Sequence, residues 1–212
     1  MRFYVLVAYS IPCTSIFRAF WYHRAMSVLS IRITLIICHI FITLLWAITS
    51  RGRNTANFFG LFRQTKSIPI VLFECFGFAQ VLLLPYLAFS MKTESMPTVK
   101  LIGLLLALFG TLLASWAKIV MGKNWGRPAQ HDKTIQSRLV TGGPFAYSRN
   151  PIYVGLLLLF LGQQAALQSY GIFLIFLFAY AVRRAVSREE QLLTKFFGQS
   201  YRTYIHKVPR FF

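Results

Sequence analysis

The chain has 212 residues, of which 56% are hydrophobic and 17% aromatic, and its 23 Lys and Arg against 5 Asp and Glu give a formal net charge of +18. These values exclude a large soluble helical domain, because 13% charged residues leave too little polar surface to cover so much apolar core. The sequence therefore predicts an all-α, polytopic helical membrane protein with one membrane domain.

The excess of basic residues has two readings, nucleic-acid binding and membrane topology. Lys and Arg cluster between the apolar segments, so topology explains them better, with added attraction to anionic membrane lipids. We expect no nucleic-acid partner. The three cysteines, Cys13, Cys38 and Cys75, lie inside apolar segments without metal-type spacing, so we expect neither a metal site nor a disulfide framework.

The first apolar segment, residues 3–20, fits a spanning helix, an interfacial helix or a signal peptide. It contains Pro12 and Arg18 but no clear small-residue cleavage site, so we favour a retained helix within an N-terminal extension, residues 1–30. Five core transmembrane helices are predicted to follow, over residues 31–50, 67–90, 98–121, 152–167 and 169–186. The last two form a hairpin whose arms, about 16–18 residues each, are near the short limit for a spanning helix.

Basic residues are distributed unevenly between the two sides of these predicted spans. The opposite loops carry only Lys92, whereas sixteen Lys and Arg lie on one side, in residues 51–66, residues 122–151 and the tail from residue 183. The positive-inside rule places these three segments in the cytoplasm.

A distinctive motif, GGPFAYSRNPIYVG, occupies residues 142–155 of one cytoplasmic segment. Asn150 is predicted as the N-cap of the next helix and Pro151 as its first residue. Arg149 beside a helix N-terminus is suited to hold an anion, such as the carboxylate of a cofactor or substrate. The simpler alternative is a capped membrane helix with an arginine that extends to the interface.

A second motif, REEQLLTKFFGQSYRTY, occupies residues 188–204 and holds two of the five acidic residues. A helix is predicted to run through it and to stop at Gly198. No basic residue lies three or four positions from Glu189 or Glu190, so their partner must come from elsewhere: Arg149, another loop or a cationic ligand. Two solvated glutamates at a membrane surface are the alternative.

The hairpin over residues 152–186 leaves the cytoplasmic membrane surface and returns to it. It should therefore bring Arg149 and Tyr153 close to the adjacent glutamates. Such a site combines an anion-binding end with a cation-binding end. S-adenosylmethionine, which carries a carboxylate, an ammonium group and a positive sulfur, has both features.

Four motifs together resemble the isoprenylcysteine carboxyl methyltransferase family and its phospholipid methyltransferase relatives: GKNW (122–125), LVTGGPF (139–145), RNPIY (149–153) and EEQLLTKFFGQSYRTY (189–204). The resemblance implies a membrane methyltransferase domain over residues 31–212, with the cofactor-binding part at about 121–212. It also implies S-adenosyl-L-methionine as cofactor, a lipid-like or prenylated acceptor, and an active site that faces the cytoplasm.

Matching by position carries the family's roles onto this chain. The segment Leu139-Val140 would line the adenosine, and Gln130 would supply a polar contact. The site residues implied are catalytic Arg149, Glu189 and Arg184; cofactor-binding Gln130, Leu139, Val140, Asn150, Pro151, Tyr153, Glu189 and Glu190; and substrate-binding Arg183 and Arg184.

The chain departs from the family pattern at two positions, since Asn150 replaces the usual His and Phe145 the usual Tyr. Asn cannot act as a base. An amine acceptor must lose a proton before it attacks a methyl group, whereas a carboxylate is already ionised, so the change favours a carboxylate acceptor or a thiolate. The alternatives are a phospholipid or small-thiol methyltransferase, an NADPH-dependent reductase of the sterol-reductase type and a non-catalytic membrane protein.

Overall fold

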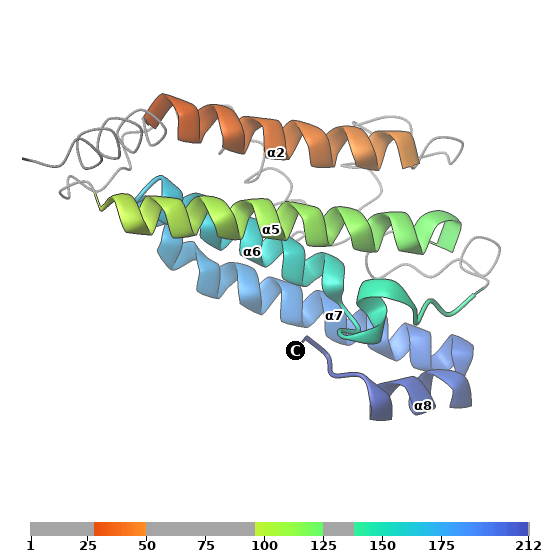
Figure 1. The fold of residues 1–212 in the computed structure, drawn as a ribbon. Helices are drawn as coiled ribbons and strands as arrows, with labels where there is room; N and C mark the ends of the chain where they lie inside the picture. Colours follow the sequence, from red (N-terminus) through yellow and green to blue (C-terminus); the bar gives the residue numbers. More distant parts are fainter. Residues whose placement is uncertain (1–27, 50–95, 125–137, 212) are drawn as a thin grey trace, which may run out of the picture.

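The protein is described here by a computed structural model that places residues 28–49, 96–124 and 138–211. Every regular element in these three ranges is helical, in agreement with the all-α prediction. The α-helices are α2 (Val28–Thr49), α5 (Pro97–Met121), α6 (Pro151–Ala166), α7 (Ile175–Phe197) and α8 (Gln199–Lys207). Short 3-10 helices cover Gly122–Asn124, Gly143–Ala146 and Tyr170–Leu174. Figure 1 shows α2, α5, α6 and α7 running along one common direction.

Among the described residues, two helical segments are long and apolar enough to cross a membrane, Pro97–Met121 and Tyr170–Phe197. Two shorter apolar helices, Ser30–Trp46 and Pro151–Ala166, accompany them. These helices support a membrane protein, but the predicted count of five spans is not confirmed. The predicted span 67–90 and the N-terminal segment 3–20 lie outside the described residues.

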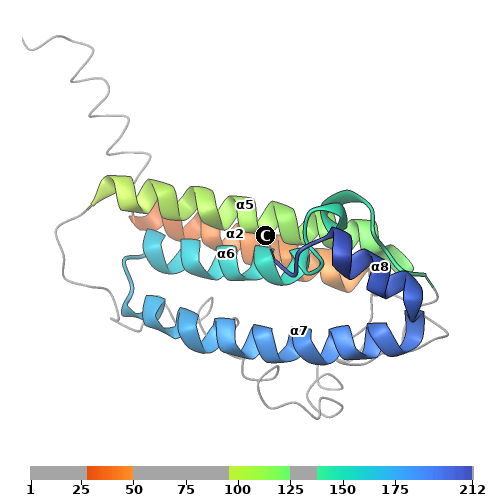
Figure 2. The same ribbon diagram turned by 90° about the horizontal axis from the view of Figure 1, so that it is seen from below.

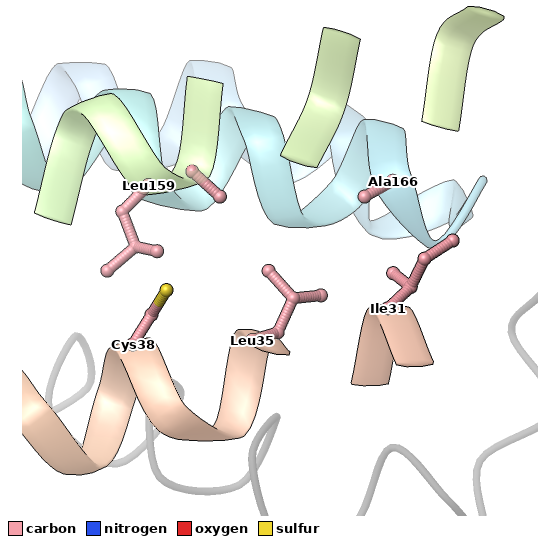
Figure 3. Close-up of a cluster of buried hydrophobic side chains, with 6 residues drawn as sticks. Ile31, Leu35, Cys38, Leu159 and Ala166 are labelled. Atoms are coloured by element: carbon pink, nitrogen blue, oxygen red, sulfur yellow. The ribbon is translucent and has the colours of Figure 1, made fainter. Parts of the chain in front are cut away.

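Helices α5 and α6 pack closely through small residues. A Cβ atom added to Gly110 would lie 2.5 Å from the carbonyl oxygen of Gly155, and one added to Gly162 would lie 2.5 Å from the carbonyl oxygen of Gly103. In a lipid environment helices associate by such close backbone approach, because burial against lipid tails gives no hydrophobic gain. Helix α2 covers this pair with Ile31, Leu35 and Cys38, which face Ala107, Leu159 and Ala166 in one buried cluster (Figure 3).

The hairpin of α6 and α7 places the end of one motif beside the other. The chain turns at Leu167–Ser169, where Gln168 has φ 48° and the Ser169 side chain accepts a hydrogen bond from the Gly171 N–H. Helix α6 has 16 residues, about 24 Å at 1.5 Å per residue. The same rise along α7 from Ile175 reaches Glu190. The matched arms thus bring the acidic pair level with the start of α6.

Helix α7 continues well past residue 186, where the predicted span ended, and stops at Gly198, which has φ 52° and is the predicted stop. Helix α8 then turns back, and the C-terminal residues run toward the start of α6 (Figure 2). There the Arg149 N–H donates to the Pro209 carbonyl at 3.0 Å. The C-terminal segment, defined here as Val208–Phe211, therefore lies against the α6 N-terminus.

Candidate functional site

Helix α6 begins at the predicted residue, but its N-cap side chain does not bond to the helix. Asn150 is the N-cap residue and Pro151 the first helical residue, yet the Asn150 side chain makes no capping hydrogen bond. Its amide nitrogen instead donates to the carbonyl oxygen of Arg210 at 3.0 Å, while its own backbone N–H donates to Ser148 Oγ at 3.2 Å. The predicted N-cap position of Asn150 is therefore confirmed, but its side chain does not cap the helix, because the amide makes a long-range bond to the C-terminal segment.

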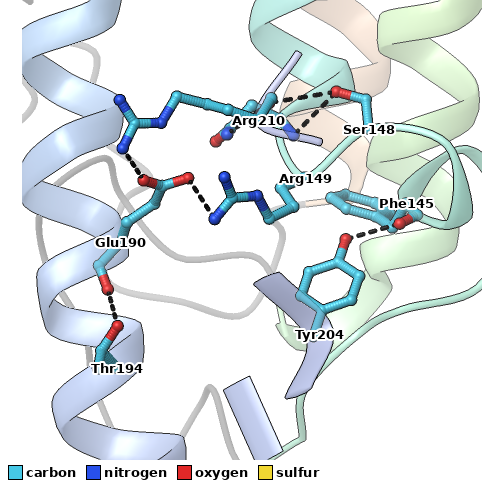
Figure 4. A network of polar contacts seen from close by, with 8 residues as sticks. Phe145, Ser148, Arg149, Glu190, Thr194, Tyr204 and Arg210 are labelled. Carbon is cyan, nitrogen blue, oxygen red and sulfur yellow. Dashed lines mark hydrogen bonds and ion pairs between the residues drawn. The ribbon is translucent and has the colours of Figure 1, made fainter. Parts of the chain in front are cut away.

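Glu190 forms the ionic centre of the site. One carboxylate oxygen lies 3.1 Å from Arg149 Nη1, and the other pairs with Arg210 Nη2 (Figure 4). The Arg149 and Glu190 side chains are only 10% and 9% exposed, so this pair is largely shielded from solvent. The prediction that the glutamates find a partner outside their own helix, with Arg149 among the candidates, is confirmed for Glu190.

Glu189 has a different neighbour. Its carboxylate accepts a hydrogen bond from the hydroxyl of Tyr153 at 3.2 Å, between the first turn of α6 and the far end of α7. Both side chains are half-buried. The predicted proximity of the two sequence motifs is confirmed by this bond and by the Arg149–Glu190 pair. The binding roles of these residues stay predictions.

The segment before α6 packs on α8 through an aromatic cluster. Leu139 lies against buried Tyr201, Tyr204 and Val208, and the adjacent Val140 is half-buried. The Tyr204 hydroxyl donates to the carbonyl of Phe145 at 2.6 Å. Burial raises the pKa of Tyr204 to about 12, against an opposing effect of the Arg149 charge, so its hydroxyl stays protonated as a donor.

Tyr204→Phe is expected to lower the free energy of unfolding by about 1–2 kcal/mol, because it leaves the buried Phe145 carbonyl without its donor. Chemical denaturation in detergent would measure the change. The matched control is Tyr147→Phe, at a side chain 70% exposed, where a change of less than about 0.5 kcal/mol is expected. Equal changes in the free energy of unfolding of the two variants would show that the Tyr204 hydrogen bond does not stabilise the fold.

Two of the predicted site residues do not join this cluster. Arg183 and Arg184 are exposed on α7, and the Arg184 guanidinium lies 5.8 Å from the centre of the Tyr180 ring. Among the described residues neither arginine forms a hydrogen bond or ion pair with the glutamates, so their catalytic and substrate roles stay predictions. Gln130 lies outside the described residues.

Arg210 was not predicted as a site residue. Its guanidinium pairs with Glu190, and its carbonyl accepts a hydrogen bond from the Asn150 side chain. Tyr201 and Tyr204 were not among the predicted site residues either, yet they are only 1% and 7% exposed beside the site. The three-residue spacing of the two tyrosines, which puts them on one face of a helix, was an available signal. No local pattern marked Arg210.

Residues 99–200, which contain the α6–α7 hairpin and both glutamates, match the phospholipid methyltransferase family model. Over this region the chain is therefore similar to phospholipid methyltransferases, and its long apolar helices support a membrane protein.

Among curated relatives, the protein-S-isoprenylcysteine O-methyltransferase of Xenopus laevis is 31% identical over 136 residues, 58% of this chain and 46% of that protein. The human protein of the same name is 32% identical over 136 residues, with the same shares. The Schizosaccharomyces pombe one is 35% identical over 103 residues, 47% of this chain and 43% of that protein. The chain thus spans about half the length of the relatives it matches. The resemblance predicted from the four motifs is confirmed, and it supports an enzyme of the methyltransferase class.

Proposed function

We propose that the protein is an S-adenosylmethionine-dependent methyltransferase of the membrane, and that it methylates a carboxylate of a lipid-like, isoprenylcysteine-type acceptor from a site that faces the cytoplasm. The observation that carries the proposal is the meeting of the two motifs. Arg149 and Tyr153 at the start of α6 contact Glu190 and Glu189 near the far end of α7. This occurs within the region that matches a methyltransferase family.

The charges of the cluster fit such a cofactor. Arg149 Nε is buried and makes no hydrogen bond to another described residue, so it is an unsatisfied donor that a bound carboxylate would satisfy. Glu189 is a half-buried carboxylate whose hydrogen bond comes from a neutral tyrosine, so an ammonium or sulfonium group bound beside it would stabilise its ionised form. When bound, the cofactor would supply an electrophilic methyl group on a positively charged sulfur.

The environment of Asn150 favours a carboxylate acceptor. Its amide is engaged with the Arg210 carbonyl and has no basic nitrogen. An amine acceptor is protonated near neutral pH and needs a base, whereas a carboxylate, with a pKa of about 4, is already ionised. The chain's contribution would then be to hold acceptor and donor in line and to exclude water.

The test uses purified protein in detergent, S-adenosylmethionine labelled on the methyl group, and two acceptors of matched size. One is a prenylated cysteine with a free carboxylate, and the other is its methyl ester. Labelling of the free acid alone, in an alkali-labile product, is the expected result. Alkali-stable label on phosphatidylethanolamine would favour the phospholipid alternative. Calorimetric binding of NADPH without binding of S-adenosylmethionine would overturn the proposal in favour of a reductase.

A further inference from the structure

The C-terminal segment is held against the candidate site by several hydrogen bonds. The Arg210 carbonyl accepts from Asn150 Nδ2 at 3.0 Å and from Ser148 Oγ at 3.4 Å, and the Pro209 carbonyl accepts from the Arg149 N–H at 3.0 Å. These bonds involve main-chain carbonyls of the segment. They direct the Arg210 side chain toward α7, where its guanidinium meets Glu190 (Figure 4).

The two adjacent glutamates consequently differ in what they can still bind. Each carboxylate oxygen of Glu190 already faces a guanidinium, one of Arg149 and one of Arg210. Glu190 is also buried, at 7% exposure. Glu189 is half-buried and accepts a hydrogen bond from the neutral Tyr153 hydroxyl. A ligand cation is therefore expected to meet Glu189, although the sequence reasoning gave a cofactor contact to both.

The charge of the ionic cluster depends on Arg210. Arg149 and Glu190 alone form a neutral pair, which would attract an anion weakly. With Arg210 the three side chains carry a net charge of +1, and Glu190 is shared between two cations. Arg149 is then only partly neutralised, and its buried Nε remains an unsatisfied donor.

We propose that Arg210 is a positioning residue for the cofactor: by pairing with Glu190 it holds Arg149 in place and keeps it positive enough to bind the cofactor carboxylate, while Glu189 meets the cofactor's positive charge. This inference rests on the proposed function. Arg210 acts through Glu190 and Arg149.

The test compares S-adenosylmethionine with decarboxylated S-adenosylmethionine, which keeps the sulfonium and the amine but lacks the carboxylate. Arg210→Gln removes the charge and leaves the main-chain carbonyl, so the bonds from Asn150 and Ser148 can persist. Calorimetry should show about tenfold weaker binding of S-adenosylmethionine and less than a twofold change for the decarboxylated compound. Arg210→Lys, which restores the charge, should recover most of the loss.

The matched control is Arg202→Gln, which removes the same charge from an exposed position of α8. It should leave both affinities unchanged. If Arg210→Gln unfolds, Arg210→Met provides a second neutral variant that keeps the aliphatic stem. If Arg210→Gln weakens the binding of both ligands equally, or of neither, the role of Arg210 is overturned while the proposed function stands. Failure of the wild-type protein to bind S-adenosylmethionine would overturn the proposed function and this inference with it.

Discussion

Glu189→Gln is expected to weaken S-adenosylmethionine binding about 100-fold, which corresponds to about 2.7 kcal/mol. Glutamine keeps the size of the side chain and a carbonyl that can accept from Tyr153 at the same position, but it removes the negative charge. Loss of one member of a shielded charge pair costs about 2–5 kcal/mol. Calorimetry on the purified protein would measure the affinity, and thermal unfolding would confirm that the fold is retained.

Two comparisons sharpen this prediction. Tyr153→Phe removes the hydrogen bond but keeps the carboxylate, so we expect a loss of less than about tenfold. Glu189→Gln should also weaken decarboxylated S-adenosylmethionine as strongly as the intact cofactor, unlike Arg210→Gln, because both ligands carry the positive groups. Wild-type affinity in Glu189→Gln would show that this carboxylate does not meet the cofactor.

Arg149→Ala is a poorer probe of binding. Arg149 is shielded and paired with Glu190, so its removal leaves a buried carboxylate with Arg210 as its one remaining ionic partner among the described residues. Breaking such a pair costs stability as well as any ligand contact. A loss of affinity in this variant would therefore combine a loss of stability with the loss of a ligand contact. Glu189→Gln tests the ligand contact alone.

The spatial meeting of the two motifs could be predicted from the sequence because it depends on helix geometry. A helix rises by a fixed 1.5 Å per residue, so two arms of similar length must bring Arg149 back near the glutamates. The absence of basic residues one turn from Glu190 then required a partner from another segment. Both inferences use regular, local rules, and the Arg149–Glu190 pair confirms them.

The contacts of the C-terminal segment could not be predicted in the same way. N-cap preferences describe a side chain that bonds its own helix, and they favoured that role for Asn150. In the structure Ser148 Oγ accepts from the Asn150 N–H, and the Asn150 amide bonds to a carbonyl 60 residues away. The partner of the Asn150 amide depends on the path that the chain takes through α8 after Gly198. No sequence pattern near Arg210 indicates that path.

The number of membrane-spanning helices could not be predicted from the sequence pattern either. Hydropathy identified the apolar parts of α6 and α7, but a helix can extend past its apolar stretch, as α7 does to Phe197. Conversely α6, with 16 residues, is shorter than a typical span although most of its residues are apolar. Helix ends are decided by turns and tertiary contacts such as those of Gln168 and Ser169, which are only partly local.

Gly162→Ala is expected to lower the free energy of unfolding by about 3 kcal/mol, the upper end of the usual range for overpacking. The new Cβ would lie 2.5 Å from the Gly103 carbonyl oxygen and closer still to the backbone nitrogen of Ala107. Both neighbours are main-chain atoms, so no flexible side chain can move away and the two helices must separate. Because each helix satisfies its own backbone hydrogen bonds, helical content should be retained while tertiary packing is lost.

The matched control is Gly142→Ala. Gly142 has φ −95°, and a Cβ there meets nothing within 4 Å, so its stability should change by less than about 0.5 kcal/mol. Denaturation in detergent would compare the variants, and circular dichroism would report helical content. Because α5 supports α6, whose first turn carries Tyr153, separation of the two helices should also weaken cofactor binding. A Gly162→Ala protein as stable as wild type would show that the α5–α6 contact is looser than its backbone distances indicate.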